Sequence, residues 1–147
     1  MAETLGSLCD KFTVVKLKVE HTDDPVKLRS LAEQEQQLIT EINEYVDDAV
    51  AGKILVEKLV FSPNKIYPYQ GNEIKAITGN LGEMIGHLAT VNCKLWHVQE
   101  QVYVFDQVPP EEKDEVIQTL SKLNLQRNQI IEELDTQFKK VVQYMWR

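Results

Sequence analysis

The chain has 147 residues, 43% of them hydrophobic and 27% charged, a composition that excludes an intrinsically disordered protein. Its net charge of −7, with lysines and arginines interspersed among acids, leaves no evident basic face for duplex nucleic acid, so only a local basic pocket fits this pattern. No stretch comes near the roughly 18 uncharged apolar residues of a membrane span, and no basic segment precedes an apolar run at the N-terminus, so we expect a single domain without a span or signal peptide.

The first predicted hairpin covers residues from about 4 to 52. Apolar residues at steps of three and four predict a short helix with its seam at Leu5, Leu8, Phe12, Val15 and Val19. In the turn that follows, Asp24 is the expected N-cap and Pro25 the first residue of the next helix. This second helix ends near Gly52, and its seam comprises Leu28, Leu31, Glu35, Leu38, Ile42, Tyr45 and Ala49.

Residues 53–72 lose the helical period and form the predicted crossover between the hairpins. Residues 62–64 and 67–71 are rich in proline and turn formers, which indicates turns and extended chain. The segment also mixes lysines with aromatic residues, including Lys65 and Tyr67. Such residues stack on and neutralise a nucleotide or sugar phosphate. The alternative is that the aromatic side chains pack over one end of the bundle.

The second predicted hairpin covers residues from about 73 to 146. Its first helix is long, and its seam comprises Ile74, Ile77, Leu81, Met84, Leu88, Val91, Leu95, Val98, Val102 and Phe105. Pro109 and Pro110 end that helix, and Pro110 suits the first turn of the next one. The seam of this last helix comprises Leu120, Leu123, Arg127, Ile130, Leu134, Phe138, Val141 and Met145.

The two hairpins resemble each other in sequence. Residues 31–43 align with residues 123–135 at a constant offset, and Val15-Lys-Leu-Lys18 resembles Cys93-Lys-Leu-Trp96. The sequence therefore predicts an all-α fold: a four-helix bundle made of two pseudo-repeated αα-hairpins with a long crossover. Cys9 and Cys93 are too few for a disulfide framework, and we expect free thiols in a reducing, cytoplasmic compartment.

A polar defect interrupts the apolar seams at one repeat position, which Glu35 occupies in the first hairpin and Arg127 in the second. An unpaired charge in a core is very costly, so one hypothesis is that these two side chains pair with each other. The other is that Arg127 lines a ligand pocket beside Asn124 and Asn128, because arginine offers a fixed fork for carboxylate or phosphate.

The long helix of the second hairpin carries another, softer stripe: Gly82, Ile85, Ala89, Asn92, Trp96, Gln99 and Tyr103. One interpretation is a wide core face. The other is a homo-oligomer interface with Trp96 and Tyr103 as its anchors.

Metal and catalytic patterns are weak in this sequence. Glu111, Glu112 and Glu115, followed by Glu132 and Asp135, match the magnesium-binding spacing of all-helical nucleotide pyrophosphohydrolases. On one uninterrupted helix, however, the two clusters would lie roughly 25 Å apart and could not share a metal ion.

Histidine and nucleophile motifs add no enzyme signature. His97 and Glu100 stand in the wrong order for a di-iron bundle. The sequence also contains no nucleophile elbow or phosphate-cradling glycine loop. We therefore expect no resident metal, no cofactor and no catalytic residue.

Three segments carry a family resemblance: residues 6–18, the motif Asn92-Cys-Lys-Leu-Trp-His97 and residues 123–135. They resemble a family of uncharacterised small helical proteins that occur in tailed phages and in bacterial sugar-transfer gene neighbourhoods. The family pattern has Leu-Trp-His in the first half as well, where this chain has Leu17-Lys18-Val19. The resemblance implies a helical fold and supplies no reaction.

A phage origin would match the chain to a general class of small phage proteins that sequester nucleotide immune signals in oligomeric pockets. The leading hypothesis is thus a non-enzymatic, homo-oligomeric protein of the cytoplasm that binds a small anionic, nucleotide-like ligand. The expected ligand-binding residues are Arg127, Asn124, Asn128, Lys65, Tyr67, Trp96 and His97. The alternatives are a helical module that binds a partner protein and a metal-dependent nucleotide phosphohydrolase.

Overall fold

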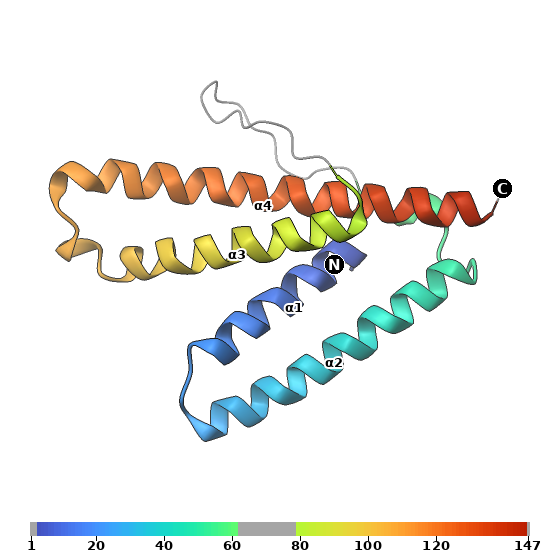
Figure 1. Cartoon of the computed structure of the whole chain (residues 1–147), viewed down its shortest axis with the longest axis horizontal. Helices are drawn as coiled ribbons and strands as arrows, with labels where there is room; N and C mark the ends of the chain where they lie inside the picture. Colours follow the sequence, from blue (N-terminus) through green and yellow to red (C-terminus); the bar gives the residue numbers. More distant parts are fainter. Residues whose placement is uncertain (1–2, 62–78, 147) are drawn as a thin grey trace.

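The computed structural model describes residues 3–61 and 79–146, and throughout these ranges the fold is all-α (Figure 1). The α-helices found there are α1 (Leu5–Glu20), α2 (Pro25–Val50), α3 (Leu81–Tyr103) and α4 (Pro110–Met145). Short 3₁₀ turns, η1 (Val56–Lys58) and η2 (Phe105–Gln107), follow α2 and α3. The predicted four-helix bundle is therefore confirmed.

Helices α1, α2 and α3 each begin after a residue whose side chain accepts a hydrogen bond from a free backbone N–H group, whereas α4 has no such cap. Thr4 caps α1 in a reciprocal capping box with Ser7, and Asp24 caps α2 ahead of Pro25, as the sequence predicts. Pro110 is the first residue of α4. Helix α2 ends close to Gly52, whose φ of 77° lies in the left-handed region that favours glycine.

Helix α3 begins later than the seam from Ile74 predicts. Asn80 has an extended backbone and accepts a hydrogen bond from the N–H of Glu83, so the helix starts at Leu81. Ile74 and Ile77 lie outside the described residues. At the other end, α3 stops at Tyr103, and Phe105 belongs to η2 instead.

Each hairpin is a pair of adjacent helices, α1 with α2 and α3 with α4, and α1 also packs against both helices of the second hairpin. Figure 1 shows α1 between α2 and the α3–α4 pair, with the two hairpins at an angle to each other. Helix α2 meets α4 over a short stretch only. Because α1 is shared, the position of its side chains determines how the hairpins are joined.

Two hydrophobic clusters within the described residues reflect this arrangement. The larger one joins both hairpins and includes Leu5, Cys9, Ala49, Leu59, Met84, Leu88, Ile130, Leu134, Phe138 and Val142. The smaller one lies between α1 and α2 and consists of Leu8, Val15, Leu31 and Leu38. Leu59 is fully buried, so the start of the predicted crossover is anchored in the main core. No helix in the described part of the chain is long and apolar enough to cross a membrane.

Candidate functional site

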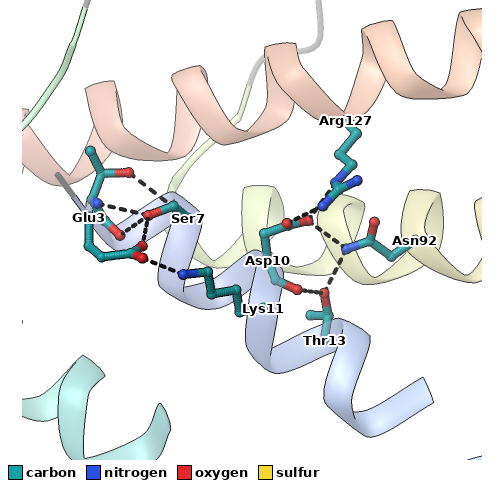
Figure 2. A network of polar contacts seen from close by, with 8 residues as sticks. Glu3, Ser7, Asp10, Lys11, Thr13, Asn92 and Arg127 are labelled. Carbon is teal, nitrogen blue, oxygen red and sulfur yellow. Dashed lines mark hydrogen bonds and ion pairs between the residues drawn. The ribbon is translucent and has the colours of Figure 1, made fainter. Parts of the chain in front are cut away.

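A polar network joins α1 to both helices of the second hairpin, and Asp10 is its centre (Figure 2). The Nε of Arg127 on α4 donates to Asp10 Oδ1 at 2.8 Å, and Arg127 Nη2 forms an ion pair with Asp10 Oδ2. The Nδ2 of Asn92 on α3 donates to Asp10 Oδ1 at 2.9 Å and to Thr13 Oγ1 at 2.7 Å. The hydroxyl of Thr13 donates in turn to the carbonyl of Asp10.

Burial and charge make this network strong. The side chain of Asp10 is 9% exposed and that of Arg127 is 35% exposed. A buried carboxylate is stable only when it is paired and hydrogen-bonded, and here one fork-to-fork contact and one amide satisfy it. The hydrogen bond from Arg127 to Asp10 also raises the pKa of the guanidinium, which stays charged.

The hypothesis that Glu35 pairs with Arg127 is wrong. Glu35 instead accepts a hydrogen bond from Lys16 at 3.1 Å, while Arg127 pairs with Asp10. Lys16 and Asp10 are both on α1, and α1 lies between the two helices that carry the polar residues. Each of the two charged seam residues therefore pairs with a residue of α1, and they do not pair with each other.

A second polar contact fixes the N-terminus of α1. The backbone N–H of Gly6 donates to Asp135 Oδ1 of α4 at 2.7 Å. A Cβ at Gly6 would lie 2.7 Å from the carbonyl oxygen of Ile131, so only glycine permits this approach. Burial raises the pKa of Asp135 to about 6, although hydrogen bonds from Gly6 and Thr4 lower it in part.

The thiol of Cys9 and the phenol of Tyr45 lie near the carboxyl group of Asp135. Burial raises the pKa of Cys9 to about 11, and the nearby carboxylate of Asp135 adds to the shift. The pKa of Tyr45 is raised to about 12 for the same two reasons. Cys9 and Cys93 form no disulfide bond, and Cys9 is buried while Cys93 is half-buried. The Cys9 thiol is consequently protonated and unreactive at neutral pH.

Two adjoining hollows lie along the α1–α2 hairpin where it faces the second hairpin. The first, here named the Arg127 hollow, has a volume of about 380 Å³ and is lined by Asp10, Lys11, Val14, Val15, Lys18, Gln34, Gln37, Leu38, Glu41 and Arg127. The second, the Trp96 hollow, has a volume of about 350 Å³ and is lined by Lys18, His21, Thr22, Lys27, Ser30, Leu31, Gln34 and Trp96. Together they form what we call the interhairpin groove.

An aromatic stack forms one wall of the Trp96 hollow. The ring of His21 stacks on the indole of Trp96 with centroids 4.7 Å apart and an interplanar angle of 29°. His21 Nδ1 lies 2.8 Å from the carbonyl oxygen of Leu17, so this nitrogen carries the proton and donates it. His97 meets His21 edge-on at 6.2 Å. The stack therefore joins the end of α1 to α3 and holds both rings beside the hollow.

The structure brings together some of the ligand-binding residues expected from the sequence. Arg127 and Trp96 both line the groove, in different hollows. His97 is exposed, lies 3.8 Å from Glu100 and reaches the groove only through His21.

The other expected ligand-binding residues are not brought into the groove. Asn124 is exposed, Asn128 is half-buried, and neither belongs to the lining of the two hollows. Lys65 and Tyr67 lie outside the described residues.

The stripe on α3 that suggested a homo-oligomer interface divides into two parts. Asn92 is buried in the Asp10 network and Trp96 stacks on His21 of the same chain, so these positions belong to a wide internal face. Tyr103 is 80% exposed and Ile85 is 39% exposed. Only the outer positions are thus open to a second copy.

The acidic residues of α4 lie as the sequence predicts. Helix α4 is continuous from Pro110 to Met145, so Glu115 and Glu132 are 17 residues apart on one helix. Asp135 is already engaged with the backbone of Gly6. In the part of the chain that the structure describes, no group of three or more histidine, cysteine or acidic residues is placed to hold a metal ion.

The residues of the site that were not predicted from the sequence include four with ionisable side chains that the site depends on: Asp10, Lys18, His21 and Lys27. For Asp10 a signal exists, because Gly6, Cys9 and Thr13 place small side chains at helical spacing on the same side of α1. Small residues at that spacing indicate a close approach of another helix, and a carboxylate among them needs a partner. For the other three residues no such signal exists, since exposed lysines and a turn histidine are common on any surface.

The chain matches no protein-family model, no curated protein and no solved structure. The resemblance to small helical proteins of tailed phages and sugar-transfer gene neighbourhoods therefore stays a prediction. The function has to be argued from the groove itself.

Proposed function

We propose that this protein binds a small anionic ligand with an aromatic ring, of the nucleotide type, in the interhairpin groove. The observation that carries the proposal is the Trp96 hollow, where the stack of Trp96 and His21 stands beside Lys18 and Lys27. The described residues that line this hollow include no aspartate or glutamate. A cationic, aromatic hollow in a chain with a net charge of −7 selects for an anion with a π-face.

Each part of such a ligand has a counterpart in the hollow. A base or similar ring stacks on the Trp96–His21 pair, since stacking on an aromatic side chain contributes about 1–3 kcal/mol per base. The ammonium groups of Lys18 and Lys27 attract the phosphate. The hydroxyl groups of Thr22 and Ser30 supply hydrogen bonds to the sugar.

We propose binding without turnover, because the lining supplies cations, hydroxyl groups and amides, which are groups that hold a ligand. A protein that binds a nucleotide without converting it lowers the free concentration of that nucleotide. The proposed role is thus sequestration in the cytoplasm, in the manner of the small phage proteins that the sequence suggested. Arg127 contributes to the neighbouring hollow, where Asp10 already holds two of its nitrogens.

Isothermal titration calorimetry with adenosine 5′-monophosphate tests the proposal. The intact chain should bind, and Lys27→Glu should weaken binding at least about tenfold, equivalent to 1.4 kcal/mol. Lys122→Glu is the matched control, since it makes the same charge change at an exposed position of α4, and its affinity should stay within about twofold.

Three outcomes of this experiment would refute the proposal. They are the absence of binding heat with the intact chain, unchanged affinity in Lys27→Glu, and equal losses in the two variants.

A second candidate is an interaction module that assembles through α4, and exposed apolar side chains favour it. Near the C-terminal end of α4, Val141 is 47% exposed and Met145 is 55% exposed. If this end joins copies of the chain, sedimentation velocity should show an oligomer that Val141→Glu and Met145→Glu dissociate. A monomer at all concentrations would exclude homo-oligomerisation, and nucleotide binding would then be a property of the single chain.

A further inference from the structure

The two hollows of the interhairpin groove adjoin each other. They share Lys18 and Gln34, which line both. The lining residues Val14 and Lys18 of α1 and His21, its C-cap, follow each other at steps of three and four, so they lie along one face. On α2 the same steps connect Leu31, Gln34, Leu38 and Glu41. The groove therefore runs lengthwise along the α1–α2 hairpin, with Arg127 and Trp96 of the second hairpin in its lining, and Lys18 lies where the two hollows meet.

The Arg127 hollow differs in chemistry from the Trp96 hollow. Two of its three cations are already neutralised, since Arg127 pairs with Asp10 and Lys11 pairs with Glu3, and the third is Lys18, which both hollows share. Glu41 adds a carboxylate to the lining, which disfavours a phosphate there.

What the Arg127 hollow offers instead is apolar surface and amides. Val14, Val15 and Leu38 are aliphatic, and Gln34 and Gln37 carry amides. An uncharged ring with hydrogen-bonding edges fits such a hollow, because the aliphatic groups contact its face and the amides meet its polar atoms.

The volumes agree with a ligand that fills both hollows. Sites for small molecules have volumes of roughly 300–1,000 Å³. The hollows of about 380 Å³ and 350 Å³ each lie near the lower limit, and together, at about 730 Å³, they are well inside the range. A mononucleotide occupies the Trp96 hollow and leaves the other half of the groove to solvent.

We infer that the ligand class is a dinucleotide, two nucleosides joined through phosphate, with one ring on Trp96, the phosphate at Lys18 and the second nucleoside in the Arg127 hollow. This inference rests on the proposed function, because it uses the same stack and the same cations. It adds that the groove binds a ligand with two nucleosides more tightly than a ligand with one.

Calorimetry with adenosine 5′-monophosphate and with P1,P2-di(adenosine-5′) diphosphate tests the inference. We expect the dinucleotide to bind at least about tenfold more tightly than the mononucleotide. Val14→Trp, which fills the Arg127 hollow, should reduce dinucleotide affinity to that of the mononucleotide and leave mononucleotide affinity unchanged. Gln37→Ala, at an exposed position of α2, is a second variant and should weaken only the dinucleotide, by about threefold or more.

The outcomes separate this inference from the proposed function. If the mononucleotide binds and the dinucleotide binds no more tightly, the inference fails while the proposed function stands. Equal losses for both ligands in Val14→Trp and in Gln37→Ala would also overturn it. If the mononucleotide does not bind the intact chain, the proposed function itself fails, and the inference fails with it.

Discussion

Replacing Asp10 by alanine is expected to lower the free energy of unfolding by about 3 kcal/mol. The carboxylate accepts two charge-assisted hydrogen bonds from Arg127 and one from Asn92, and a hydrogen bond to a charged group contributes about 1.5–3 kcal/mol. The sum is discounted because the side chain of Arg127 is 35% exposed and regains water when Asp10 is removed. Asn92 is 3% exposed but keeps its bond to Thr13.

Urea unfolding followed by far-ultraviolet circular dichroism measures this loss. A double-mutant cycle with Asp10→Ala and Arg127→Ala isolates the coupling between the two side chains, and we expect about 1–3 kcal/mol. The matched control is the pair of Lys16 and Glu35, which also joins α1 to another helix but lies closer to solvent. Its coupling should stay below about 1 kcal/mol.

Two results would refute this reasoning. One is a loss below about 1 kcal/mol in Asp10→Ala, which would mean that the buried carboxylate stabilises the folded chain no more than a surface residue does. The other is a coupling to Arg127 as small as that between Lys16 and Glu35. In either case the Asp10–Arg127 pair would not be what holds the hairpins together, and the apolar core would dominate.

Two further predictions concern the N-terminus of α1. Gly6→Ala should destabilise the fold by about 1–3 kcal/mol, because the new Cβ meets the carbonyl of Ile131, whereas Gly86→Ala, with open space around its Cβ, should be neutral or stabilising in the same urea assay. The pKa of Asp135 is raised from 3.8 to about 6, so its contribution to stability is present below pH 3.8 and is lost as the pH rises through 6. Asp135→Asn keeps an acceptor for the N–H of Gly6 without the charge, and it should gain up to about 3 kcal/mol over the native chain between pH 4 and pH 7. A stability difference independent of pH would contradict this.

The sequence predicts the helices well because their boundaries depend on local chemistry. The turn with Asp24 and Pro25, the break at Pro110 and the end near Gly52 all arise from capping and backbone preferences that neighbouring residues determine. The predicted start of α3 is wrong because the apolar period in the sequence continues upstream of Asn80, the residue that caps the helix. There the capping box, and not the apolar period, determines where the helix begins.

The candidate site could be predicted only in part, since it depends on how the hairpins meet. The sequence shows that Arg127 breaks a seam, but a seam position does not reveal which of three other helices it faces. The partner of Arg127 is Asp10, and the alignment of the two hairpins does not predict that pairing. The stack of His21 on Trp96 is equally non-local, because 75 residues separate the two rings.

The position of the groove follows from the contacts of α1, which differ between the two hairpins. Helix α1 supplies Lys16 to Glu35 on one side and Asp10 to Arg127 on the other, so it is attached to both hairpins by charge. At its C-terminal end it meets α3 through the Trp96 stack. The two attachments to the second hairpin lie at different parts of the interhairpin groove, with Arg127 in one hollow and Trp96 in the other. Arg127 and Trp96, which help to define the orientation of α1, thus also shape the proposed ligand site, and a change that loosens either attachment should alter affinity as well as stability.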